Sequence, residues 1–439
     1  MSWLFARKAL LSLGWANDVR LLLRAGRIAE VQTNVAPSAT DEIVDILIPG
    51  LCNAHSHAFQ RALAGRTERP SPDGKDNFWN WRTRMYELAN GVDAGQMAAI
   101  AAQAYGEMLE AGYTSVAEFH YLHCDAGNNS DAMFHALQDA ASVTGIRLTY
   151  VPVLYERAGF DHSELLDHQQ RFAMPLDALL RHHERCSQSA GENTTVAIGA
   201  HSLRAVTSES LAAVAKVAVV QKIPMHLHIA EQQAEIEQCI SATGKRPVQW
   251  LLDNVDLNER WCLVHATHMN ETETERLAKS KAVICICPTT EANLGDGIFP
   301  LQSFLTHGGR IAIGSDSQVS INPFEELRWL EYGQRLATLS RNVSEDLFLR
   351  CLAGGSQAGG LCSTGLAEGS DADFVSLAAD DPMLIGHDND TILDALIYSG
   401  YRLPIERVMV AGEWRVADGR HVEQATTRRD FAAVMETLR

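Results

Sequence analysis

From about residue 49 to residue 355, short apolar or β-branched runs alternate with longer stretches of helical periodicity. The runs that predict strands are residues 115–119, 147–154, 195–200, 223–228, 261–265, 282–287 and 310–314. With a further strand ending near Asn53, they give about eight βα repeats over roughly 300 residues, which is the rhythm of a (β/α)8 barrel. A doubly wound open sheet would need a similar pattern, but no glycine-rich phosphate loop follows the first strand. The sequence therefore predicts an α/β fold built on a TIM-like barrel.

Both flanks of this region have the pattern of β-structure. Runs at residues 19–23 and 28–31 flank a turn at Ala25-Gly26, which indicates a hairpin. Residues 408–416 predict a second hairpin that turns at Ala411-Gly412. We expect the two flanks to pair into one small β-sheet domain beside the barrel. The expected division is a composite β domain of residues 1–48 and 360–439 and a catalytic barrel of residues 49–359.

The helical stretches of the barrel include residues 94–111, 208–221 and 323–339. The last of these has a clear start signal, with Asn322 as the N-cap and Pro323 at the first helical position. A capping side chain accepts a hydrogen bond from a backbone N–H that the first helical turn leaves unpaired. The sequence therefore predicts the residue at which this helix begins.

The charge of the chain limits its partners. Its 37 basic and 55 acidic residues give a formal net charge of −18, whereas binding to nucleic acid or to an anionic membrane surface needs a basic footprint. No apolar stretch is long enough to span a bilayer, and Arg7 and Lys8 interrupt the N-terminal apolar run where a leader would continue. The nine cysteines have irregular spacing and are expected to be reduced thiols. We therefore expect a cytoplasmic protein without a nucleic-acid or membrane partner.

Candidate metal ligands follow several of the predicted barrel strands. His55 and His57 come directly after the first strand, and His228 and Asp316 end later ones. Active sites of such barrels are built at the carboxyl ends of the strands, and alternate residues at a strand end point the same way. Three imidazoles and one carboxylate suit zinc or ferrous iron with a position left open for water. A lone buried histidine is more often structural, and His226, one pleat deeper in the strand, is interpreted in that way.

Two further residues could perform acid–base chemistry beside such a metal. Glu231 lies three residues beyond His228, in the loop over the strand end, and suits a general acid or base. His265 ends the next strand and could stabilise developing charge.

These motifs resemble the amidohydrolase superfamily. The resemblance rests on residues 49–57, on the H-x-x-E of residues 228–231, on His265 and on Gly314-Ser315-Asp316. It is strongest with the deaminase-like branch that uses one metal ion. The branches with two metals usually have a bridging lysine on the fourth strand, and residues 197–202 contain none. The resemblance therefore implies one divalent ion, with zinc favoured and iron as the alternative.

A closer resemblance links the chain to the formimidoylglutamate deiminase family, from about residue 20 to residue 425. It rests on HSHAFQRA (55–62), FWNWR (78–82), EFHY (118–121), HSLR (201–204), CPTTEANLGDG (287–297) and EELRWLEYGQR (325–335). That family converts N-formimino-L-glutamate to N-formyl-L-glutamate and ammonia in histidine degradation, and its members are often homodimers. The implied residues are His55, His57, His228 and Asp316 for the metal, Glu231, His265 and Asp316 for catalysis, and Gln60, Arg82, Tyr121, His201 and Arg204 for the substrate.

The expected substrate carries two carboxylates, so local cations must capture it. Arginine suits bidentate carboxylate binding, although a surface ion pair is its usual role. Arg204 lies four residues past a strand end, and Arg82 is expected in a long loop that folds over the mouth of the barrel. Trp79 and Trp81 are expected to pack within that loop.

One position departs from the family pattern, because Gln318 stands where many relatives have histidine. The change leaves open a shifted substrate preference. The alternatives are a deaminase of the same branch acting on formimino-aspartate or on a purine- or pyrimidine-type heterocycle, and a metal-binding barrel without catalysis.

Overall fold

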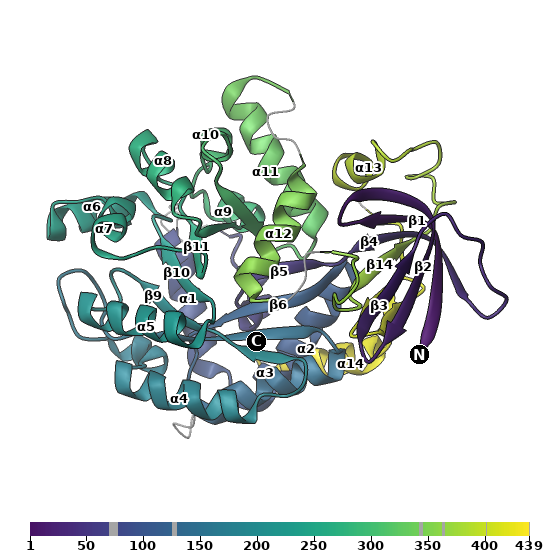
Figure 1. Cartoon of the computed structure of the whole chain (residues 1–439). Helices are drawn as coiled ribbons and strands as arrows, with labels where there is room; N and C mark the ends of the chain where they lie inside the picture. Colours follow the sequence, from purple (N-terminus) through teal and green to yellow (C-terminus); the bar gives the residue numbers. More distant parts are fainter. Residues whose placement is uncertain (70–77, 125–129, 342–345, 362–364, 401, 439) are drawn as a thin grey trace.

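The computed structural model of the chain describes residues 1–69, 78–124, 130–341, 346–361, 365–400 and 402–438. A barrel of parallel strands forms one part, and a second sheet lies beside it (Figure 1). Within the described ranges, none of the helices combines the length and apolar character needed to cross a membrane.

The barrel follows the predicted βα alternation. Its strands are β5 (Leu51–Ser56), β6 (Tyr113–His120), β7 (Arg147–Leu154), β9 (Ile198–Ser202), β10 (Met225–Ile229), β11 (Trp261–His265), β12 (Val283–Ile286) and β13 (Arg310–Ile313), with the short β8 (Thr194–Val196) paired to β7. All pairings are parallel, and most strand residues are buried, as expected for a parallel sheet covered on both faces. The predicted fold class is confirmed.

The barrel closes between its first and last strands, directly under the candidate metal ligands. The N–H of Asp316 donates to the carbonyl of His55, and the N–H of His57 donates to the carbonyl of Asp316, each at 3.0 Å. Gly314 permits this approach, because a Cβ there would lie 2.8 Å from the His55 carbonyl oxygen and 2.9 Å from its nitrogen.

Helices surround the barrel strands. They are α1 (Phe78–Gly91), α2 (Ala94–Glu110), α3 (Ser130–Thr144), α4 (Leu176–Ser189), α5 (Ser208–Gln221), α6 (Gln233–Thr243), α7 (Pro247–Asn254), α8 (Glu271–Lys279), α9 (Pro288–Leu294), α10 (Leu301–Thr306), α11 (Pro323–Thr338) and α12 (Leu347–Gly359), with the 3-10 turns η1 (Ala58–Leu63) and η2 (Asp167–Phe172). Asn322 caps α11 by accepting from the N–H groups of Phe324 at 2.9 Å and Glu325 at 3.2 Å. The predicted N-cap is confirmed.

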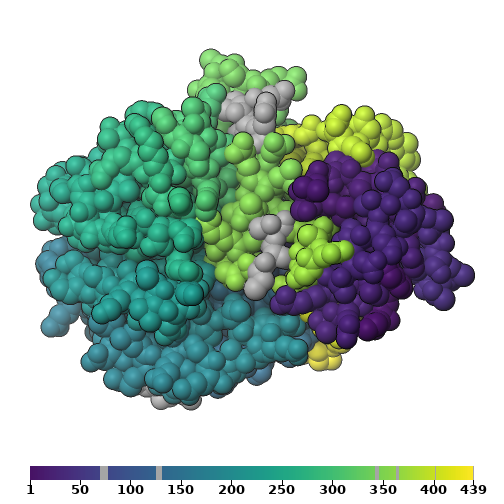
Figure 2. All heavy atoms as spheres, viewed as in Figure 1, coloured from purple at the N-terminus to yellow at the C-terminus, as the bar shows by residue number. Residues whose placement is uncertain are grey.

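The second sheet is assembled from two distant parts of the sequence. Its strands are β1 (Ser2–Leu11), β2 (Gly14–Arg24), β3 (Arg27–Gln32), β4 (Glu42–Pro49), β14 (Phe374–Leu377), β15 (Ile405–Val410), β16 (Glu413–Ala417) and β17 (Arg420–His421). They are ordered β17-β16-β15-β14-β4-β1-β2-β3, so the seam between the two parts is the antiparallel pair of β4 and β14. Figure 2 shows the two parts, purple and yellow to yellow-green, gathered on one side of the barrel.

A partly buried group of three charged residues joins this sheet to the barrel. Arg147, at the start of β7, bonds through Nε to Asp373 Oδ2 at 2.5 Å and lies 3.4 Å from Asp371 Oδ1 through Nη2. The N–H of Ala411 also donates to Asp373, at 2.7 Å. These contacts fix the start of β14, an interior strand of the sheet, against the barrel.

The flanks differ from the expected pattern in three elements. Strand β1 was not predicted, and neither were the helices α13 (Ile392–Tyr398) and α14 (Gln424–Thr437). Helix α14 packs against α2 of the barrel, so the last residues described are not confined to the sheet. The domain boundaries at residues 48 and 360 stay predictions.

Candidate active site

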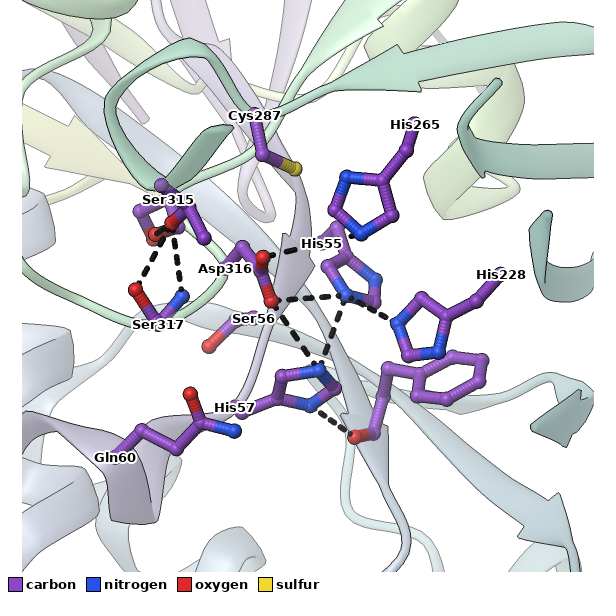
Figure 3. Close-up of polar contacts among 12 residues, drawn as sticks. His55, Ser56, His57, Gln60, His228, His265, Cys287, Ser315, Asp316 and Ser317 are labelled. Carbon is purple, nitrogen blue, oxygen red and sulfur yellow. Dashed lines mark hydrogen bonds and ion pairs between the residues drawn. The ribbon is translucent and has the colours of Figure 1, made fainter. Parts of the chain in front are cut away.

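Four side chains from β5, β10 and the end of β13 converge at the carboxyl end of the barrel (Figure 3). His55 Nε2 lies 3.2 Å from His57 Nε2 and 3.0 Å from His228 Nε2. Asp316 Oδ1 lies 3.3 Å from His55 Nε2 and 3.2 Å from His57 Nε2. The structure therefore brings together all four residues that the sequence suggested as metal ligands.

The chemistry of these donors fits a divalent cation. The Nδ1 of His57 donates to the carbonyl of Phe119 at 2.8 Å, which leaves the lone pair of the neutral ring on Nε2, inside the cluster. Burial lowers the pKa of His55 to about 3 and lowers those of His57 and His228, so the rings are neutral ligands. Burial opposes ionisation of Asp316, but a hydrogen bond with His55 and nearby histidine charge hold its pKa well below the usual range.

Asp316 also belongs to a second group of buried ligand atoms. Its carboxylate, His265 and Cys287 lie within 4.8 Å of one another. Eight cysteines, Cys287 among them, are free thiols, while Cys362 lies outside the described residues.

Several strands end in a strained backbone at this site. Ala230, His265 and Asp316 have φ angles of 53°, 71° and 47°, in the left-handed region that non-glycine residues rarely adopt. Such conformations cost roughly 1–3 kcal/mol each and persist only where the surroundings hold them. They turn the chain sharply at the points where functional side chains leave the strands.

Glu231 and His265 lie beside the cluster, as expected from the sequence. His265 Nε2 is 3.9 Å from both Glu231 Oε1 and Asp316 Oδ2. Burial raises the pKa of Glu231. Burial lowers the pKa of His265, but Glu231, a hydrogen bond to Glu291 and Asp316 outweigh this effect and raise it to about 10. The pair can therefore carry a proton close to the cluster.

A pocket of about 500 Å³ opens over these groups. It is also lined by all five expected substrate contacts, Gln60, Arg82, Tyr121, His201 and Arg204. Gln60 Nε2 donates to the Tyr121 hydroxyl at 2.9 Å, which joins two of them. The pocket thus connects the metal-ligand cluster with two guanidinium groups.

The local setting of Arg82 differs from the prediction. The loop expected at residues 78–82 is the first part of helix α1, so that prediction was wrong. Arg82 Nε donates to the Tyr86 hydroxyl one turn later, and its guanidinium lies 5.3 Å from the Trp79 ring centre. Arg82 and Tyr86 are four residues apart and therefore lie on one face of the helix, which brings their side chains into contact. Trp81 lines the pocket rather than packing within a loop.

Arg204 is held through its backbone by a neighbouring loop. Arg157 donates from Nε to the Arg204 carbonyl and from Nη2 to the Leu203 carbonyl, each at 3.1 Å. Burial opposes the charge of Arg204, but nearby tyrosines and the carboxylates of Glu235 and Glu231 raise its pKa. The guanidinium therefore stays charged in the pocket.

Two buried carboxylates next to the site were not predicted from the sequence. Glu291 lies 3.2 Å from His265 Nδ1. Glu118 accepts from Ser56 Oγ at 2.6 Å and from the N–H of Ala58 at 2.7 Å, and burial raises its pKa to about 7. Both lie inside motifs that were quoted for the family resemblance, but nothing in the linear sequence links them to their partners.

Two residues that were not expected to bind the metal have structural partners. Gln318 is buried and donates from Nε2 to Ser56 Oγ at 2.9 Å and to the Asp316 carbonyl at 3.0 Å. His226 contacts the carbonyl of Ala358 through Nε2 at 2.9 Å, away from the cluster. Gln318 is thus part of the hydrogen-bond network that supports the Asp316 loop.

The fold and this ligand cluster define the class of the protein. Residues 46–415 match the Amidohydrolase family, which covers more than half of the chain. The chain therefore belongs to the amidohydrolase family and is a hydrolase. Members of this superfamily are metal-dependent, which agrees with the convergent histidine and aspartate side chains.

Residues 1–45 match the N-terminal domain of formimidoylglutamate deiminase HutF. The chain is 43% identical to formimidoylglutamate deiminase of Pseudomonas aeruginosa, with 100% of each chain covered. It is 27% identical to 8-oxoguanine deaminase of the same organism, over 91% of this chain and 90% of the relative. The crystal structure of an amidohydrolase from Brucella melitensis has a TM-score of 0.94 and 39% identity, covering 100% of both chains. The resemblance to the formimidoylglutamate deiminase family is confirmed.

Proposed function

We propose that this chain hydrolyses N-formimino-L-glutamate to N-formyl-L-glutamate and ammonia, as a step in histidine degradation. The observation that carries the proposal is the single pocket that joins the metal-ligand cluster, Glu231 and His265 to the two arginines. The 43% identity to formimidoylglutamate deiminase supports the choice of substrate over a heterocycle.

The metal would be held by His55, His57, His228 and Asp316, whose nitrogen and carboxylate donors suit one zinc ion, with ferrous iron as the alternative. When bound, a divalent cation acts as a Lewis acid that makes water more acidic and more nucleophilic.

The side chains would bind the substrate at both of its ends. Arg82 and Arg204, which both line the pocket, would bind the two carboxylates, because a guanidinium offers paired N–H donors to each. This arrangement directs the formimino group toward Glu231 and Asp316. The glutamate nitrogen, at the arginine end, stays away from the proton donor.

Glu231 would move protons during the reaction. It donates a proton to the imino nitrogen, which makes the formimino carbon more electrophilic, while Asp316 accepts a proton from the attacking water. Water oxygen bonds to that carbon and gives a tetrahedral intermediate. Glu231, now deprotonated, takes the proton of the intermediate's hydroxyl group and passes it to the same nitrogen, the C–N bond breaks, and ammonia leaves. The proton held by Asp316 then returns to Glu231 and restores both carboxyl groups. His265 stabilises the negative charge that develops beside it.

The test is ammonia release from N-formimino-L-glutamate by purified, metal-loaded protein, with formimino-L-aspartate and adenosine measured alongside. We expect rapid turnover of the glutamate compound, loss of that activity on chelation, and recovery with zinc. Preferred turnover of the aspartate compound or of adenosine would replace the proposed substrate but keep the reaction class. A cytoplasmic location and a homodimer stay predictions.

A further inference from the structure

We propose that Glu291 is a positioning residue for the deimination, because its carboxylate fixes the orientation of the His265 ring through the Nδ1–H. The role in catalysis rests on the proposed function, in which His265 stabilises charge beside Asp316. The hydrogen bond itself does not depend on the substrate.

The carboxylate of Glu291 is anchored where it meets the histidine. Glu291 lies in the first turn of α9 with 4% of its surface exposed. Its Oε1 accepts from His265 Nδ1 at 3.2 Å and from the N–H of Cys287, the residue that precedes α9, at 3.0 Å. The N–H of Glu291 in turn donates to the Cys287 carbonyl at 2.9 Å. The oxygen that meets the ring is therefore held by the start of a helix.

This contact decides which nitrogen of the His265 ring faces the active site. A carboxylate can only accept, so Nδ1 must carry a proton and point to Glu291, and Nε2 faces the active site. Nε2 lies 3.9 Å from both Glu231 and Asp316, whereas Glu291 makes the shortest polar contact of the ring among the described residues. A partner on Nδ1 commonly sets the other ring nitrogen in this way at metal and catalytic sites.

The strained backbone conformation at His265 makes a hydrogen-bond partner for its ring necessary. His265 and Ala266 have φ angles of 71° and 50°, so the strand ends in two consecutive left-handed residues. A hydrogen bond from helix α9, which follows strand β12, holds the ring where this strained turn places it. Without that bond the ring is free to rotate, and Nε2 no longer faces the cluster.

Two substitutions separate the hydrogen bond from the carboxylate charge. Glu291→Gln keeps an oxygen that can accept from Nδ1, because the neighbouring N–H of Cys287 orients the amide oxygen toward it. Glu291→Ala removes the acceptor. We expect kcat to fall about ten- to a hundredfold in Glu291→Ala with KM within about threefold of wild type, and most of the activity to return in Glu291→Gln.

A matched control tests the same helix without touching His265. Glu326 is also fully buried and accepts from the N–H of Thr289 in α9 at 2.9 Å. Glu326→Ala therefore disturbs the start of α9 but leaves the His265 hydrogen bond intact. We expect its metal content and kcat to match wild type within about threefold. An equal loss of kcat in this control would show that α9 stability, rather than the histidine contact, explains the effect, and would overturn the proposal.

The hydrogen bond from His265 Nδ1 to Glu291 can be observed directly by nitrogen-15 NMR of histidine-labelled, metal-loaded protein. We expect the Nδ1–H resonance of His265 at a hydrogen-bonded position in wild type and Glu291→Gln, and a displaced or lost resonance in Glu291→Ala with the same metal content by mass spectrometry. An unchanged His265 signal in Glu291→Ala would overturn the proposal. If wild type releases no ammonia from N-formimino-L-glutamate, the proposed function fails, while the NMR comparison still decides whether Glu291 holds the His265 ring.

Discussion

At the scale of single residues, the two ends of the pocket differ in the kind of side chain that lines them. One end gathers neutral imidazoles and carboxylates, and the other holds Arg82 and Arg204. The chain as a whole carries a net charge of −18, so attraction for a dianionic ligand must come from local cations such as these two arginines. Substitutions at the two ends should therefore change different kinetic constants.

Glu231→Gln tests the proton-transfer end. Because Glu231 is not among the four converging ligands, the variant should keep its metal, while kcat falls about 100- to 10,000-fold through loss of the proton donor. Metal analysis and steady-state kinetics measure the two effects. Glu237→Gln on the exposed side of α6 is the control and should behave as wild type. Near-normal turnover by Glu231→Gln would remove Glu231 from the mechanism.

Arg204→Gln and Arg82→Gln test the carboxylate end. Loss of a charge-assisted bond is worth roughly 1.5–3 kcal/mol, so KM should rise about 10- to 100-fold with a smaller change in kcat. The effect should be weaker for a formimino amino acid with one carboxylate. Arg276→Gln, which breaks an exposed pair with Asp253, is the control. A large drop in kcat at unchanged KM would assign the arginines to the chemical step instead.

The metal-ligand cluster could be predicted from the sequence because each member ends a strand of a parallel barrel. Strand direction alone brings such residues to one face. Glu291 could not be found in this way, since it reaches His265 from a helix after a different strand. No periodic pattern in the sequence relates positions 265 and 291.

At the scale of elements, the clearest local prediction is the start of α11. Asn322 accepts two backbone hydrogen bonds there, so substitution of this one side chain removes the cap. Asn322→Ala should lower the free energy of unfolding by about 1 kcal/mol, as measured by urea denaturation. Asn322→Asp keeps an acceptor and should stay close to wild type. Equal stability of all three proteins would show that solvent replaces the cap.

Some elements could be predicted in full, while others could not. The bounds of β7 and β11 equal the predicted runs, because these strands are continuous apolar segments with buried faces on both sides. Strand β1 was missed because Arg7 and Lys8 interrupt its apolar pattern; Arg7 is exposed and pairs with Asp45. Helix α14 buries little besides Thr427, so its pattern carries weak periodicity.

At the scale of the whole molecule, buried neutral histidines should make the fold sensitive to acid. Burial lowers the pKa of His183 to about 4 and that of His120 to about 3, with nearby His182 adding to both shifts. The unfolded chain takes up protons near the ordinary histidine pKa of about 6.5, so stability falls as pH decreases from about 6.5 toward 4.

The melting temperature at pH 7, 5.5 and 4.5 measures this effect. His183→Phe should reduce the loss on acidification, because it removes one group that the unfolded state protonates first. His135→Phe on the exposed side of α3 is the control and should keep the wild-type pH dependence. The same slope in both variants would exclude His183 as a contributor.

The seam between β4 and β14 has a consequence for synthesis of the protein. Pro49 pairs with Phe374, so 325 residues separate the two partners in the chain. At roughly 5–20 residues per second, a ribosome needs roughly 16–65 s to make that stretch. The outer edge of β4 stays without its final neighbour during this interval, while the whole barrel emerges and can bind its metal. The nascent chain must therefore shield an open strand edge from other nascent chains until β14 is made.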